Sequence, residues 1–269
     1  MAITALHAAA SGMRALDEKL NVVANNLANV NTHGFKGMRV NFEDLLYQVK
    51  REPGIPNLDI EPIPHGILIG TGVKVSGTQL NFEPGSVDPT NRPLDWQIDG
   101  EGFFQVTTIH DGARIFAYTR AGNFARNAVG NIVLGNSSGP VLEPPIAIPD
   151  DAIEISVGRN GEVRVRQQGS STLNVIGQIE LARFVNPEGL KTIGQNLYVE
   201  TDASGPPVNA PPQSDGLGAI NQNQLEMSNV DPVRELIDLI TTQRAFELNS
   251  QSIQSADETL QIISNLRRF

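Results

Sequence analysis

The sequence predicts an α+β fold in which long N- and C-terminal helices form a discontinuous, coiled-coil-like base and the middle forms a mainly antiparallel β domain. Three observations predict it. Apolar residues recur at spacings of three and four near one end and at spacings of seven near the other. Short apolar runs separated by turn formers fill the middle. A proline-rich stretch lies on each side of that middle region.

The N-terminal segment carries a heptad pattern that predicts a helix from Ala2 to Asn29. The series is Leu6, Ala9, Met13, Leu16, Leu20, Val23, Leu27 and Val30. Spacings of three and four keep side chains on one face of an α-helix, so the pattern indicates packing on another helix. We expect the helix to end at Asn31-Thr32-His33-Gly34, where turn formers and a capping glycine follow.

The C-terminal segment carries a matching pattern. Its series is Leu239, Phe246, Ile253 and Leu260, flanked by Leu236, Ile240, Ala256 and Ile263. Asp231-Pro232 supplies an N-cap and a proline at the first helical position. The alternate seam positions Gln243, Ser250 and Asp257 are polar, which favours a helix with several partners and some hydrated contacts over an isolated two-stranded coiled coil. The alternative is two ordinary amphipathic helices folded onto the middle domain.

Between the two ends, short apolar or alternating runs predict β-strands. They lie at 103–106, 115–118, 132–134, 153–157, 163–165 and 176–181. Asp99-Gly100, Asp111-Gly112, Asn160-Gly161 and Asn186-Pro187-Glu188-Gly189 predict the turns between them. Prolines cluster at 53–64 and 206–212, where they favour extended backbone. We therefore expect a helical base from 1–32 with 230–269, an extended connector over 33–80, a β domain over 81–205 and a return linker over 206–229.

Composition narrows the possible functions. The net charge is -10 and the pI is near 4.9, which argues against nucleic acid or an anionic membrane as a partner. The chain contains no cysteine, so disulfides and thiolate metal sites are excluded. No apolar run approaches the ~18 residues that span a bilayer. The first residues lack a basic region followed by an apolar one, so no cleaved signal peptide is expected.

Motifs for catalysis are weak. His7, His33, His65 and His110 show no metal-ligand spacing. The run 135–139 matches G-x-S-x-G by letter, but Pro140-Val141-Leu142 follows where a nucleophile elbow needs a helix, so a hairpin turn is predicted. Gly70-Thr71-Gly72 lacks the residues that complete a phosphate loop. We expect no catalytic, cofactor or metal residues, and a protein that is not an enzyme.

Several motifs resemble those of the flagellar rod and hook axial proteins. At the N-terminal end the matching stretch runs from Ala24 to Lys36 and reads ANNLANVNTHGFK. At the other end it comprises 228–231 and 243–247, and in the middle 99–104, 118–124 and 194–198. The resemblance covers nearly the whole chain. It is closest to the members that build the distal rod, because 42–48 and the long segment to Gly66 are typical of them.

The resemblance implies a structural subunit of a helical tube. Its terminal helices would line a channel for exported subunits, its β domains would form the outer wall, and the tube would transmit torque to the hook. The implied partners are identical copies, the proximal rod proteins, the hook protein, the peptidoglycan and outer-membrane ring proteins, and the export apparatus. The implied location is the basal body, from the periplasm to the outer membrane, after export without a cleaved signal.

Sixteen residues are therefore predicted to make assembly contacts. Buried amides can fix the register of packed helices, which motivates including the asparagines. The set is Leu6, Met13, Leu16, Leu20, Val23, Asn25, Asn26, Leu27, Asn29, Val30, Phe35, Leu239, Phe246, Ile253, Leu260 and Ile263. Two other interpretations stay open: a proximal rod or hook protein of the same family, and a secreted cell-wall hydrolase or carbohydrate-binding β protein.

Overall fold

The computed structural model describes residues 2–52, 65–169 and 172–266, which divide into two compact units. The helical unit comprises Met1–Ala28, Met38–Gln79 and Asp231–Phe269. The β unit comprises Asn29–Gly37 and Leu80–Val230. The chain therefore passes between the units four times, at 28/29, 37/38, 79/80 and 230/231.

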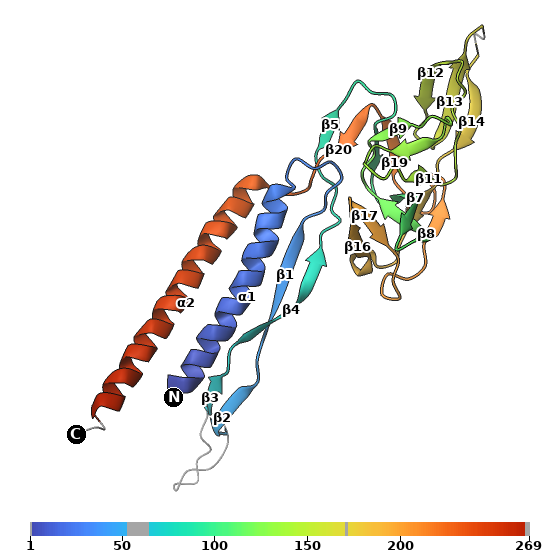
Figure 1. Cartoon of the computed structure of the whole chain (residues 1–269). Helices are drawn as coiled ribbons and strands as arrows, with labels where there is room; N and C mark the ends of the chain where they lie inside the picture. The colour runs from blue at the N-terminus through green and yellow to red at the C-terminus, as the bar shows by residue number, and fades with distance from the viewer. Residues whose placement is uncertain (1, 53–64, 170–171, 267–269) are drawn as a thin grey trace. The chain divides into compact units, whose positions relative to one another are not determined.

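Two long helices form the main part of the helical unit. They are α1, Ala2–Ala28, and α2, Pro232–Leu266, and they pack side by side (Figure 1). The predicted N-cap is confirmed, because Asp231 Oδ1 accepts the N–H of Val233 at 2.9 Å. Gly34 does not cap α1, since it lies beyond the helix end, in the β unit. There φ is +70°, and an added Cβ would lie 2.5 Å from Ala121 N, so this position requires glycine.

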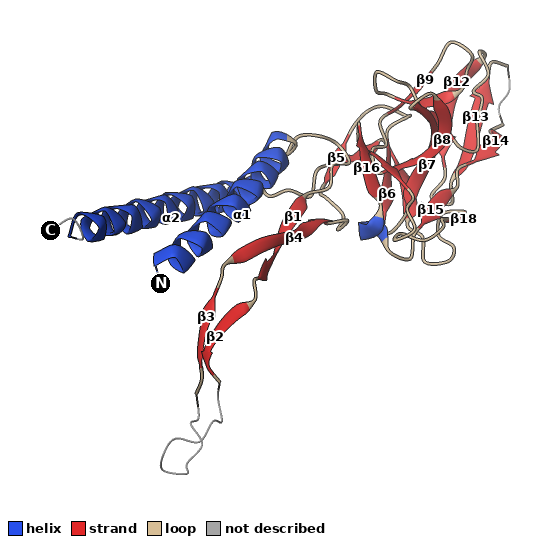
Figure 2. Cartoon of the chain, turned by 60° about the horizontal axis from the view of Figure 1, so that its bottom comes forward, coloured by secondary structure: helices blue, strands red, loops and turns tan. Residues whose placement is uncertain are grey.

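The helical unit also contains two antiparallel strand pairs, drawn in red beside and below the helices in Figure 2. Strand β1 pairs with β4, and β2 pairs with β3. Their bounds are β1 Met38–Asp44, β2 Tyr47–Arg51, β3 Ile67–Gly70 and β4 Val73–Leu80. This part was expected to be an extended connector, and within its described residues the extended backbone is instead paired. The proline-rich run 53–64 lies outside the described residues.

The β unit is built on a nine-stranded sheet. Its main path runs β16-β17-β8-β7-β11-β10-β9, and β15 joins β7 to β18. The bounds are β7 Phe103–His110, β8 Ala113–Thr119, β9 Phe124–Arg126, β10 Ile132–Leu134, β11 Val141–Leu142, β15 Leu181–Arg183, β16 Lys191–Gly194, β17 Leu197–Val199 and β18 Val208–Ala210. The β7–β8 hairpin turns at Asp111-Gly112, where both residues have positive φ, as the sequence predicts.

Smaller antiparallel groups complete this unit. A three-stranded sheet has the order β12-β13-β14, β19 pairs with β6, and β20 pairs with β5. Their bounds are β5 Val87–Pro89, β6 Trp96–Asp99, β12 Ala152–Val157, β13 Glu162–Gln167, β14 Asn174–Gln178, β19 Ala219–Gln222 and β20 Gln224–Glu226, with a short 3₁₀ helix at Pro187–Gly189. The expected return linker, 206–229, thus contains three strands of the β unit, because its apolar residues find pairing partners there.

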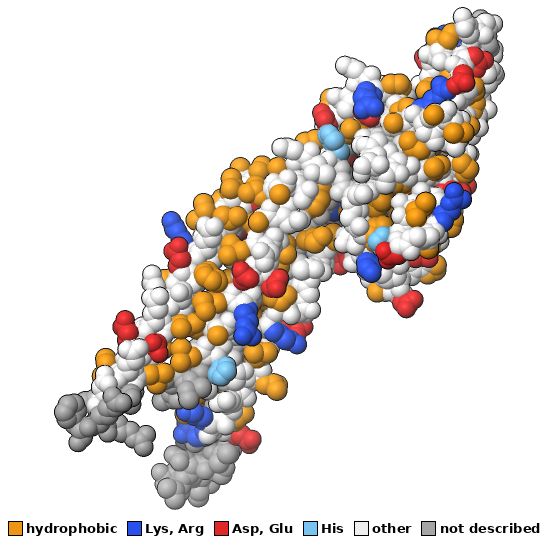
Figure 3. All heavy atoms as spheres, in the orientation of Figure 1, with side chains coloured by type: hydrophobic (Ala, Val, Ile, Leu, Met, Phe, Trp, Pro, Cys, Tyr) orange, Lys and Arg blue, Asp and Glu red, His pale blue; other side chains and the backbone are white. Residues whose placement is uncertain are grey.

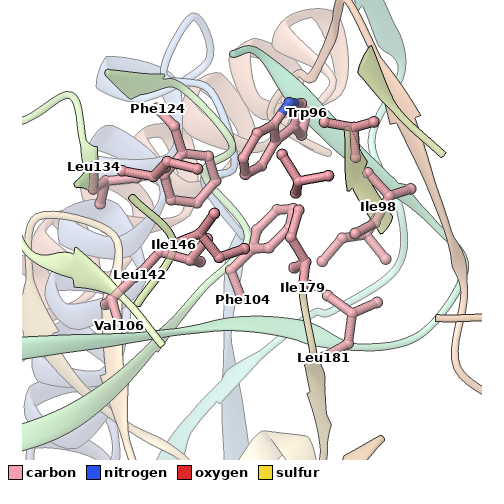
Figure 4. Close-up of a cluster of buried hydrophobic side chains, with 14 of the residues drawn as sticks. Trp96, Ile98, Phe104, Val106, Phe124, Leu134, Leu142, Ile146, Ile179 and Leu181 are labelled. Atoms are coloured by element: carbon pink, nitrogen blue, oxygen red, sulfur yellow. The ribbon is translucent and has the colours of Figure 1, made fainter. Parts of the chain in front are cut away.

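The core of the β unit is buried on both faces of β7. On one face, Trp96, Phe104 and Phe124 form the centre of a large apolar cluster (Figure 4). On the other, the ring of Phe103 meets those of Phe184 and Tyr198 edge-on. The two adjacent phenylalanines of one strand therefore serve two cores, which fixes the position of β7 in the sheet.

Candidate functional site: apolar faces of the helical unit

The predicted apolar series of α1 lies on the side that is covered by other elements. Val23 is buried, and the remaining helical members are half-buried: Leu6, Met13, Leu16, Leu20 and Leu27. The structure does not place the whole predicted set on this helix. Asn29, Val30 and Phe35 follow its last residue and belong to the β unit, where Phe35 is buried.

The matching series of α2 is also half-buried and comprises Leu239, Phe246, Ile253 and Leu260. These four side chains lie on the face of α2 opposite to its exposed apolar residues, which are described next. The side chain of Ile263 lies outside the described residues. The two helices contact each other, and the half-burial of both series agrees with packing between them. A supercoiled, coiled-coil geometry stays a prediction.

A second group of apolar side chains on α2 extends beyond the predicted series and includes only two of its flanking residues, Leu236 and Ile240. Its large exposed side chains are Val233, Leu236, Ile237, Ile240, Leu248 and Ile262, with exposed fractions from 46% to 63%. At 3.6 residues per turn, all six fall within an arc of about 120°. We call them the outer face of α2. Figure 3 shows hydrophobic side chains along the visible side of the helical unit. Four of the six lie between Val233 and Ile240, where α2 is apolar on two sides, as is typical of a helix that packs against several partners.

Asn26 holds the C-terminal end of α1 in place. Its side chain is buried; Nδ2 donates to Met38 O at 2.8 Å, and Oδ1 accepts Met38 N–H at 3.0 Å. Nδ2 also lies 3.2 Å from Glu235 Oε1 on α2. Burial raises the pKa of Glu235, while the hydrogen bond from Asn26 opposes that rise. One amide therefore connects α1, β1 and α2. Asn25, by contrast, is exposed.

The paired strands of the helical unit expose further apolar side chains. Those of β1, β2, β3 and the β1–β2 connection are Phe42, Leu46, Tyr47, Val49, Ile67 and Leu68. Val49 pairs with Leu68 across the strands, so the two share one face. We call β2 and β3 the ribbon. The alternating Tyr47-Gln48-Val49 was the available sequence signal for it.

The described residues offer no arrangement for metal chemistry: no group of three or more His, Asp or Glu among them could hold a metal ion. The G-x-S-x-G letters 135–139 form the turn between the antiparallel strands β10 and β11, as predicted. In the described part of the chain, neither helix has a stretch long and apolar enough to cross a membrane.

A helix from each chain end, together with the exposed apolar side chains of α2 and the ribbon, indicates a class of protein: a structural subunit that associates with others. Comparison with known proteins specifies the family. The matching descriptions are "Flagella basal body rod protein" at 6–36, "Flagellar hook protein FlgE/F/G D1 domain" at 97–165, and "Flagellar basal body rod FlgEFG protein C-terminal" at 221–266.

Similar proteins align with this chain over nearly its full length. The FlgG proteins of Agrobacterium fabrum and Caulobacter vibrioides are 44% and 43% identical to this chain, covering 97% and 98% of it and 98% and 99% of the relatives. The Caulobacter FlgF protein is 34% identical over 94% of each chain. The chain belongs to the flagellar basal-body rod protein family, and it is a structural subunit of the rod.

Proposed function

We propose that the chain polymerises into the distal segment of the rod through its terminal helices. The observation that carries this proposal is the presence of two opposite apolar faces on α2, because a single chain covers only one of them. Exposed apolar side chains gathered on one side of a helix are typical of an interaction site. Copies related by a repeated rotation and translation would bury the outer face of α2 against a neighbour and form an open helical tube.

In this tube the sixteen assembly residues predicted from the sequence would act between copies as well as within them. The tube would transmit torque to the hook and enclose the export channel. It would contact the proximal rod, the hook, and the peptidoglycan and outer-membrane ring proteins. Catalysis, cofactors and nucleic acid have no part in this proposal. The location would be the basal body, between periplasm and outer membrane, after export through the flagellar apparatus without a cleaved signal.

Two observations favour the distal rod over a proximal rod protein. Within Caulobacter, identity to the FlgG relative exceeds identity to the FlgF relative, 43% against 34%. The ribbon is also present at the position where the sequence predicts a segment typical of distal rod members. The rod-family match extends over nearly the whole chain and leaves the cell-wall hydrolase alternative without support.

The ribbon would stiffen the tube by packing on neighbouring copies. A two-stranded hairpin is marginally stable alone, and this one exposes apolar side chains that need cover. Deleting 49–64 should leave subunits that assemble into a shaft with a shorter persistence length in electron micrographs. An unchanged persistence length would return the ribbon to the status of a surface loop.

The proposed function is tested by expressing the chain in flagellated cells that lack their own FlgG. We expect rods of normal length and restored swimming. Purified protein should form tubes above a critical concentration and should release no muropeptides from peptidoglycan. Absence of both rods and tubes would contradict the proposal, and muropeptide release would revive the hydrolase alternative.

A further inference from the structure

Three segments of the β unit adjoin the points where the chain passes between the units. They are 29–37, 80–86 and 226–230. Four side chains join these segments to one another and to the sheet: Lys36, Arg120, Glu226 and Asn229. We call them the junction cluster. All four belong to the β unit.

A buried ion pair forms the centre of the junction cluster. The side chains of Lys36 and Glu226 are both 0% exposed, and Lys36 Nζ donates to Glu226 Oε1 at 2.6 Å. The same ammonium donates to Glu83 O at 2.7 Å, and the same carboxylate oxygen accepts Gly85 N–H at 3.0 Å. One charged pair therefore connects all three segments.

Asn229 makes the same three-way connection with an uncharged group. Its Oδ1 accepts Gly37 N–H at 2.8 Å, and its Nδ2 donates to Asn81 O at 2.9 Å and to Glu83 O at 3.2 Å. Gly37 O in turn accepts Asn81 N–H at 2.8 Å. The segments are thus fixed twice, by the charged pair and by the amide.

Arg120 connects this group to the sheet. Its Nε lies 3.6 Å from Glu226 Oε2, and its Nη2 donates to Gly100 O at 2.8 Å. The guanidinium carbon lies 5.7 Å from the centre of the Phe103 ring, on β7. Burial lowers the pKa of both Lys36 and Arg120, while Glu226 opposes that change.

Stability alone gives little reason for such an arrangement. Burying two cations and one anion carries a desolvation penalty that well-packed apolar side chains would avoid. The charges instead fix the positions of the segments that they connect. Each buried charged group must lie within hydrogen-bonding distance of its partner, so the segment that carries it has one favourable position.

We propose that the junction cluster is the point at which mechanical load enters the β unit. This inference rests on the proposed function, in which the rod carries torque. Segments held separately would be pulled off the sheet one at a time. Segments held by a shared set of bonds must be displaced together, and bonds loaded in parallel resist more force than bonds broken in sequence. The junction cluster therefore distributes the load over the three segments that it connects.

The first test is amide hydrogen exchange on the full-length monomer carrying Glu226→Gln or Lys36→Met. Exchange in 29–37, 80–86 and 226–230 should accelerate by about a hundredfold or more, while β7 and β8 keep their wild-type rates. The matched control is Glu154→Gln, which removes an exposed ion pair with Arg166 and should change nothing. Equal acceleration across β7 and β8 would show that the cluster only stabilises the core, and would overturn the inference.

The second test applies load in cells that lack their own FlgG. Cells with the Glu226→Gln protein should swim normally in dilute medium but lose swimming in viscous medium through broken rods. Full speed in viscous medium would overturn the inference and leave the proposed function intact, whereas failure of the wild-type chain to form rods would count against the proposed function. If the Glu226→Gln protein does not fold, the same swimming test is made with Asn229→Ser. That change weakens the connection of the same segments and leaves no buried charge without its partner.

Discussion

The two units of the molecule bury their side chains to very different degrees. In the described part of the helical unit, the buried residues are Ala15, Val23, Asn26 and Thr242. The β unit buries Trp96, Phe104 and Phe124 completely, together with the charges of the junction cluster. The difference indicates that the β unit is stabilised within one chain, whereas the helical unit depends on other chains to cover its apolar surface.

The largest expected effect is a contrast in hydrogen exchange. In a verified monomer, amides of residues 1–28 and 235–269 should exchange at least about a thousandfold faster than those of 100–200, because local opening of the helices exposes little new apolar surface. Mass spectrometry after deuterium labelling measures both regions in one sample. Equal protection of helices and β7 would refute the contrast between the units.

The next expected effect separates two phenylalanines. Phe104→Ala should lower the free energy of unfolding of the β unit by about 3–5 kcal/mol, since the ring is fully buried. Phe246→Ala should leave the thermal melting of the β unit unchanged and prevent tube formation, because this half-buried ring completes its burial only in the assembly. A lower melting temperature of the β unit in Phe246→Ala would place that ring in the monomer core instead.

A smaller effect is expected for the outer face of α2. Ile240→Ser should weaken the association of each subunit by about 1.5–3 kcal/mol, because one apolar side chain is no longer buried. The critical concentration for tube formation should therefore rise roughly ten- to hundredfold. Light scattering against protein concentration measures this shift. Ser252→Ala, at an exposed polar position of α2 outside this arc, is the control. Matching critical concentrations for Ile240→Ser and wild type would mean that this face stays in solvent.

The smallest expected effect concerns the amide that connects α1, β1 and α2. Asn26→Leu leaves the N–H and C=O of Met38 without their side-chain partner, at a cost of about 1–3 kcal/mol. The melting temperature of assembled tubes should fall, while that of the β unit in the monomer should not. Asn21→Leu, at an exposed position of α1, serves as the control and should melt like wild type.

The features of the fold that were predicted correctly from the sequence are determined by residues close together in the chain. Asp231 caps α2, and Asp111-Gly112 turns the β7–β8 hairpin, because each needs only its immediate neighbours. The junction cluster could not be predicted in this way, since Lys36 and Glu226 are 190 residues apart and neither lies in a periodic pattern. The outer face of α2 was not recognised for another reason: the sequence pattern counted Leu236 and Ile240 as flanks of the heptad series, whereas the structure exposes them together with Val233 and Ile237.

The hydrogen bond between Gly37 and Asn229 has a consequence for the order in which the chain folds. The partners Asn26 and Glu235 are separated by 209 residues, so pairing the helices directly would require closing a very long loop. Once the β unit has folded, the segment 29–37 that follows α1 and the segment 226–230 that precedes α2 are neighbours, because Gly37 N and Asn229 Oδ1 lie 2.8 Å apart. Closure entropy is then lost during folding of the β unit, and helix pairing becomes a fast, local final step.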